Sequence, residues 1–119
     1  MSLIKQKDIE LAKTNLDYLE ATVLQMQKDV QLHGIYFEID KTRLSSYETV
    51  LNEVNLICEQ LLRQDAGKFF SILYSIDIGE QKVRNLLGEN QSKSGIGELI
   101  LERELLKVLT KKHYADRMK

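Results

Sequence analysis

The sequence predicts an all-α fold, a helical bundle of four to five helices built on a long antiparallel αα-hairpin. The chain has no proline, the residue that most strongly breaks helix interiors. Leu, Glu, Lys, Gln and Ile are abundant, and most of these are good helix formers. Apolar residues also recur at alternating spacings of three and four, which is typical of amphipathic helices.

The first helix is expected to run from about Gln6 to His33. Its apolar stripe keeps heptad spacing, and Gly34 follows as a favourable left-handed helix stop. The stripe consists of Ile9, Ala12, Leu16, Leu19, Val23, Met26 and Val30. A second seven-spaced series lies about 130° around the same helix. This series consists of Ile4, Leu11, Tyr18 and Leu32. One partner helix cannot cover both faces, so this helix is predicted to be the hub of the bundle or to present the second series to another subunit. Scattered surface residues are the alternative.

Residues 35–39 alternate with period two, but no other segment offers them a partner strand, so we expect an extended connector at the end of the bundle. The second helix is expected from about Arg43 to Arg63, with Asp40 or Thr42 as its cap. Because the connector is short, the two long helices are expected to pack against each other in antiparallel orientation.

The rest of the chain is expected to form two short helices and one long one. They span about 66–75, 78–87 and 96–114, with Asp65 and Asp77 as caps. One kinked helix over 66–87 is the alternative to the two short ones. The last helix is apolar around much of its circumference, so it is expected deep in the bundle or partly in an oligomer interface. We therefore expect one domain over residues 1–119, in which 65–119 pack on a hairpin formed by 1–64.

Two segments of the C-terminal half carry a resemblance. Residues 69–77 read FFSILYSID, and residues 99–105 read LILEREL. They resemble a group of small uncharacterised bacterial helical proteins, and the resemblance covers roughly half of the chain. It implies an all-helical fold. That group has no assigned activity, so the resemblance implies nothing about chemistry.

Composition favours a soluble cytoplasmic protein. The formal net charge is −1, which gives the chain no polyelectrolyte character. Cys58 is the one cysteine, so no disulfide can form within the chain, and this favours a reducing compartment. No apolar run is long enough for a membrane span, and the N-terminus has no leader-like apolar region.

No catalytic residue, metal ligand or cofactor site is predicted, and the chain is not expected to be an enzyme. His33 and His113 lack the Glu-x-x-His spacing of di-metal bundles. Cys58 lies in the apolar stripe of the second helix, where a buried small residue is expected rather than a nucleophile. Lys93 and Ser94 lack the glycine spacing and the preceding strand of a phosphate-binding loop.

Three functional hypotheses follow. The favoured one is a non-catalytic protein-interaction module with a structural, adaptor or regulatory role, acting as a homodimer through the second apolar series. The alternative is nucleic-acid binding through the basic C-terminal helix, although cations also favour a helix C-terminus through its dipole. The basic residues are Lys107, Lys111, Lys112, Arg117 and Lys119. A ligand-binding or catalytic cavity inside the bundle is the third hypothesis.

Overall fold

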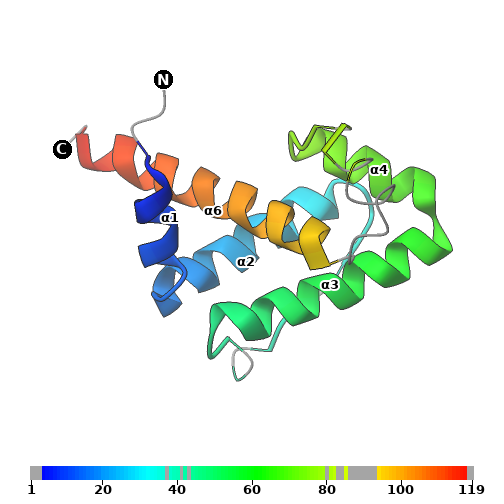
Figure 1. Cartoon of the computed structure of the whole chain (residues 1–119), viewed down its shortest axis with the longest axis horizontal. Helices are drawn as coiled ribbons and strands as arrows, with labels where there is room; N and C mark the ends of the chain where they lie inside the picture. Colours follow the sequence, from blue (N-terminus) through cyan, green and yellow to red (C-terminus); the bar gives the residue numbers. More distant parts are fainter. Residues whose placement is uncertain are drawn as a thin grey trace.

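The computed structural model shows a bundle of helices (Figure 1). It describes residues 4–36, 38–40, 42, 44–79, 81–82, 85 and 94–117. The helices are α1 (Gln6–Ala12), α2 (Leu16–Gln31), α3 (Tyr47–Gln64), α4 (Ala66–Ser75) and α6 (Ser94–Arg117). Within these ranges no residue belongs to a strand, and the predicted all-α bundle is confirmed.

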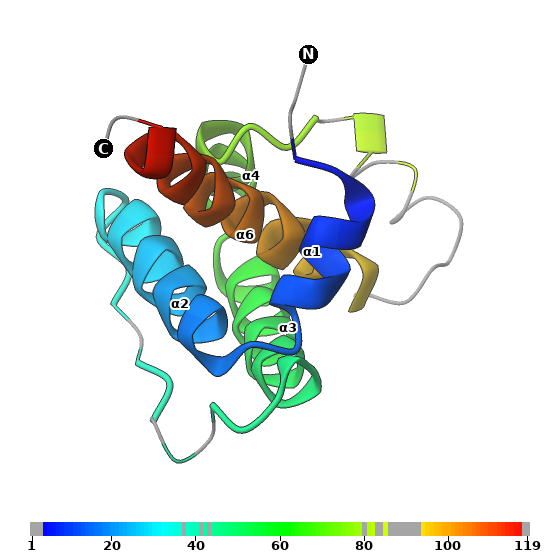
Figure 2. The same cartoon turned by 90° about the vertical axis from the view of Figure 1, so that its left-hand side faces the viewer.

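The last helix, α6, is the centre of the bundle. It packs against α1, α2 and α3, whereas α4 packs on α3 (Figure 2). Its buried apolar side chains are Ile96, Ile100, Leu101, Leu105 and Leu109. The deep position predicted for this helix is therefore confirmed. The hub predicted for the first helix is wrong, because α6 carries the apolar faces that meet several neighbours.

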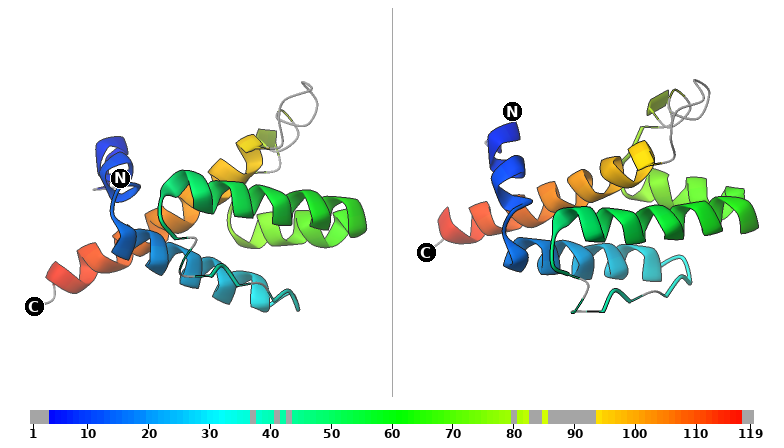
Figure 3. Two further views of the ribbon diagram at one scale, coloured as in Figure 1. Left: turned by 90° about the horizontal axis from the view of Figure 1, so that it is seen from below. Right: turned by 60° about the horizontal axis from the view of Figure 1, so that its bottom comes forward.

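The single helix predicted over residues 6–33 is in fact two helices. The chain turns at residues 13–15, and Asn15 caps α2 with its side chain. Asn15 Oδ1 accepts hydrogen bonds from the backbone N–H groups of Asp17 at 2.9 Å and Tyr18 at 3.2 Å. Asparagine is among the best N-cap residues because its side chain satisfies these otherwise unpaired donors. As a result, α1 leaves the line of α2 and crosses α6 steeply (Figure 3).

The two long helices α2 and α3 run in the same direction, and both run opposite to α6 (Figure 3). Gln25 of α2 contacts Lys111 of α6, and Asp29, which is further along α2, contacts Lys107, which is earlier in α6. The chain directions of α2 and α6 are therefore opposite. The antiparallel pairing predicted for these two helices does not form. The described residues between α2 and α3 (32–36, 38–40, 42 and 44–46) lead the chain back along α2 to the start of α3 (Figure 3). An antiparallel hairpin is formed instead by α3 and α4, which have a very short link.

The helix ends follow local chemistry. Ser46 caps α3 by accepting the backbone N–H of Thr49 at 3.2 Å, so this helix begins later than predicted. Asp65 caps α4 by accepting the N–H of Lys68 at 3.0 Å, as predicted, and α4 has the predicted bounds. Gly34 has a φ of 76°, which confirms the predicted left-handed stop after α2.

Asp77 ends α4 and does not begin a new helix. Its φ of 72° is left-handed, whereas an N-cap residue has extended backbone. The N–H of Asp77 donates to the carbonyl of Tyr74, and the N–H of Ile78 donates to that of Leu73, each at 3.0 Å. This pair of bonds satisfies the last carbonyls of α4. Half of the residues in the helix predicted over 78–87 lie outside the described ones, and of the described residues, 81–82 and 85 are helical.

Two apolar clusters hold the described residues together. The larger one gathers buried side chains from α2, α3, α4 and α6, together with Ile39 of the connector. Cys58 lies in it, as predicted, beside an apolar cavity of about 30 Å³. The smaller cluster lies under α1. It comprises Ala12, Leu105 and Leu109, with Ile4, Ile9 and Tyr18 packed against them.

Candidate functional site

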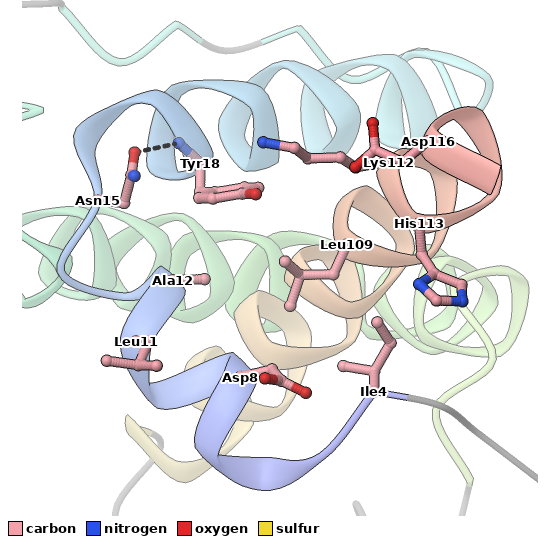
Figure 4. Close-up of a pocket in the computed structure, with 10 residues that line it drawn as sticks. All are labelled: Ile4, Asp8, Leu11, Ala12, Asn15, Tyr18, Leu109, Lys112, His113 and Asp116. Carbon is pink, nitrogen blue, oxygen red and sulfur yellow. Dashed lines mark hydrogen bonds between the residues drawn. The ribbon is translucent and has the colours of Figure 1, made fainter. Parts of the chain in front are cut away.

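A groove of about 390 Å³ lies between α1, the start of α2 and the C-terminal part of α6 (Figure 4). Its lining residues are Ile4, Asp8, Leu11, Ala12, Asn15, Tyr18, Leu109, Lys112, His113 and Asp116. Ala12 and Leu109 are buried and belong to the smaller apolar cluster. The groove therefore has an apolar floor, and side chains of both charge signs lie around it.

The structure brings together three members of the predicted interface series. Ile4 and Tyr18 are partly buried in the groove, and Leu11 lies at its edge with 68% of its surface exposed. Leu32 is 85% exposed but follows the far end of α2. The turn at residues 13–15 separates the series, because α1 and α2 no longer share one axis.

Two members of the predicted basic patch face α2. The Nζ atom of Lys107 lies 2.8 Å from Oδ2 of Asp29 and 3.3 Å from Oε1 of Glu104. Lys111 donates a hydrogen bond to the side-chain carbonyl of Gln25. These lysines link α6 to α2, so their charges are engaged within the molecule.

Lys112 is the member of the basic patch that reaches the groove. Its Nζ atom lies 4.7 Å from the centroid of the Tyr18 ring, and its interaction with Tyr18 raises the pKa of the lysine. His113 lies beside it, and its Nε2 atom is buried without a hydrogen-bond partner among the described residues. Lys119 and the side chain of Arg117 lie outside the described residues.

A buried carboxyl group links α6 to α2 next to these lysines. Glu104 is fully buried, and burial, aided by a hydrogen bond with Asp29, raises its pKa to about 8. Burial also opposes ionisation of Asp29, but hydrogen bonds with Glu104 and Lys107 outweigh burial and lower the Asp29 pKa. At neutral pH Glu104 therefore keeps its proton beside the Asp29 carboxylate.

Sequence reasoning missed Glu104 because a glutamate on a helix is usually solvated. A signal was present in the spacing. Ile100 and Val108 lie four residues before and after it, and Leu101 lies three residues before it, so Glu104 shares a face with apolar residues. A charged residue inside such a face indicates a paired or protonated side chain.

Lys13 anchors α1 to α6 and α3. Its Nζ atom lies 2.7 Å from Glu102, 3.2 Å from Glu10 and 3.7 Å from Glu98, and 4.7 Å from the centroid of the Tyr47 ring. Burial disfavours the ammonium ion, but hydrogen bonds with Glu102 and Glu10 outweigh that penalty and raise the Lys13 pKa. The side chain is 11% exposed, so solvent screens these attractions less than it would on an open surface.

Comparisons with known proteins add no assignment. No protein-family model matches the chain, and no curated protein or solved structure is significantly similar to it. In the described ranges, no three His, Cys, Asp or Glu side chains are grouped as ligands for a metal ion. None of the helices in those ranges is long and apolar enough to cross a membrane.

Proposed function

We propose that this chain is a non-catalytic helical protein-interaction module, and that it forms a homodimer through the groove between α1 and α6. The observation that carries the proposal is the position of Leu11. Its side chain is 68% exposed at the edge of a groove with an apolar floor. Burying that side chain against a second molecule would remove apolar surface from water, which favours association.

The charges around the groove favour a second copy as the partner. Asp8 and Asp116 are acidic, whereas Lys112 is basic. A two-fold contact places one patch against an identical patch, so it requires a surface that is complementary to itself. An apolar centre with charges of both signs meets that requirement.

The polar clusters in the described residues support a non-catalytic role. The Lys13 cluster ties α1 to α6, and the Asp29–Lys107 pair ties α2 to α6. Both clusters therefore have a structural use. Burial raises the pKa of Cys58 to about 12, which keeps this thiol protonated and weakly nucleophilic. A cytoplasmic location belongs to the same proposal, supported by the free thiol at this position.

Replacing Leu11 with glutamate tests the dimer. Leu11→Glu puts a carboxylate into the apolar contact, so we expect the dissociation constant to rise at least tenfold, or about 1.4 kcal/mol. Sedimentation equilibrium measures this constant. The chain itself is expected to stay folded, because Leu11 is largely exposed.

Leu32→Glu is the matched control. Leu32 is also a highly exposed leucine, but it lies at the other end of α2. This variant is expected to dimerise like the unmodified chain. A monomeric unmodified chain at high micromolar concentration, or equal behaviour of the two variants, would contradict the proposal.

A further inference from the structure

Leu16 belongs to the apolar heptad stripe of the sequence, but the bend at residues 13–15 leaves its side chain exposed. The stripe members Ala12, Leu19 and Val23 are at most 3% exposed, but Leu16 is 53% exposed. In one continuous helix, Leu16 would lie on the same face as Ala12, four residues before it, and Leu19, three residues after it. The bend at residues 13–15 turns this leucine out of its own stripe.

The bend itself contains residues that a helix accepts. Lys13, Thr14 and Asn15 include neither glycine nor proline. The bend is stabilised by the Asn15 cap on α2 and by a hydrogen bond from Thr14 Oγ1 to the carbonyl of Leu11 at 2.7 Å. Straightening would replace these bonds with ordinary backbone hydrogen bonds of a continuous helix.

The contacts of α1 can be made by an identical segment of another molecule. α1 packs on α6, where Ala12 lies against Leu105 and Leu109. Lys13 adds the ion pair with Glu102 at 2.7 Å. The α1 of a second copy carries the same side chains, so it can re-form every one of these contacts on the α6 of its partner.

We propose that the homodimer forms by exchange of α1. Residues 13–15 straighten, α1 and α2 join into one helix, and α1 of each copy packs on α6 of the other. The two joined helices then cross near this segment, and Leu11 and Leu16, which flank it, are buried between the copies. This inference rests on the proposed homodimer and names how it forms.

Replacing Leu16 with proline distinguishes the bent segment of the monomer from the continuous helix of the exchanged dimer. This position is the first residue of α2, where proline is accepted, and Asn15 before it is extended, with φ −108° and ψ 115°. Leu16→Pro is therefore compatible with the bend. In a continuous helix, the proline ring would clash with the carbonyl of Ala12 and remove a hydrogen bond.

We expect Leu16→Pro to raise the dimer dissociation constant at least tenfold by sedimentation equilibrium. Leu16→Ala is the control, because it loses the same side chain from the contact but permits a continuous helix, so its dissociation constant is expected to lie at least tenfold below that of Leu16→Pro. If Leu16→Pro dimerises as well as Leu16→Ala, exchange of α1 is overturned while the homodimer stands. If the unmodified chain is monomeric, the proposed function itself fails.

Charge reversal gives a second test that does not depend on proline. Lys13→Glu and Glu102→Lys each place like charges at the α1–α6 contact within one molecule. In an exchanged heterodimer of these two variants, the introduced glutamate meets the introduced lysine, and the native Lys13 meets the native Glu102. The variants are warmed together to allow exchange and followed by native mass spectrometry. We expect heterodimers at a concentration at least tenfold below that at which either variant self-associates. A mixture that associates no better than its components would overturn the exchange.

Discussion

Glu104 brings a carboxyl group into the contact between α2 and α6, and this contact depends on the group keeping its proton. The side chain is fully buried, and its neighbours are Asp29 and Lys107. A single lysine can balance one carboxylate there. Ionising Glu104 as well would leave two negative charges against one positive charge in a poorly solvated place.

This arrangement predicts a loss of stability as the pH rises. The pKa of Glu104 is about 8 in the folded chain, against 4.5 for an ordinary glutamate, so the folded state holds an extra proton between these values. Its contribution to the free energy of unfolding is fully present below pH 4.5 and is lost as the pH approaches about 8. Glu104→Gln cannot ionise, yet its amide can still donate to Asp29. We expect it to be more stable than the unmodified chain at pH 8, by about 1–3 kcal/mol.

Urea unfolding at pH 5 and at pH 8 measures the effect. Glu98→Gln is the control, since Glu98 is on the same helix but its side chain is 49% exposed. The control is expected to keep the pH dependence of the unmodified chain. An unchanged pH dependence in Glu104→Gln would show that Glu104 ionises without cost.

At the scale of elements, α3 and α6 approach each other closely at Gly97. A Cβ atom at this position would lie 1.9 Å from Oδ1 and 2.9 Å from Cγ of Asn55, and 3.4 Å from Cδ1 of Leu51. The two helices must separate, or Asn55 must move, to admit a methyl group. We expect Gly97→Ala to lower the free energy of unfolding by about 1–3 kcal/mol, measured by urea denaturation.

Gly67→Ala is the matched control for this close approach. Gly67 lies in α4, and the nearest atom to an added Cβ there, Oδ1 of Asp65, is at an ordinary distance of 3.6 Å. Alanine favours helix more than glycine does, so this change should be neutral or stabilising by up to about 1 kcal/mol. Equal losses at the two positions would mean that helix contact is not the cause.

Local signals predicted some elements correctly. Gly34 ends α2 through its left-handed backbone, and Asp65 caps α4, because each property belongs to the residue itself. The bend at residues 13–15 could not be predicted in this way. The heptad spacing continues in phase across it, and the bend depends on the Asn15 cap and on the distant partner Glu102.

The candidate site was predictable only in part, for the same reason. Ile4, Leu11 and Tyr18 do gather in one groove, but through a bend in the chain and not along one helix face. Leu32 lies apart because α2 carries it away from the groove. The apolar neighbours of Glu104 on its helix face indicate burial, but its pairing with Asp29 depends on α2 packing over α6, which spacing within one helix does not specify.

At the scale of the whole molecule, α1 is the most weakly attached helix of the described bundle. It packs on α6 and has one buried residue, Ala12, whereas α6 packs on three helices. Helices with few buried contacts open at lower free energy than the rest of a protein. We therefore expect the amide protons of α1 to exchange with solvent faster than those of α6.

Hydrogen exchange followed by mass spectrometry checks this order at a concentration where the chain is monomeric. Lys13→Ala, which removes the ion pair with Glu102, is expected to speed exchange in α1 and leave α3 unchanged. Similar protection of α1 and α6 would contradict the order.

The placement of Cys58 allows opening of the main core to be followed separately from detachment of α1. It is the one cysteine of the chain, and it is 7% exposed within the larger apolar cluster, away from α1. An alkylating reagent can reach the thiol when α3 and its neighbours part, whereas release of α1 leaves the thiol covered. The alkylation rate therefore counts openings of the main core, and exchange of the α1 amides counts detachment of that helix, so one unmodified chain reports both events separately.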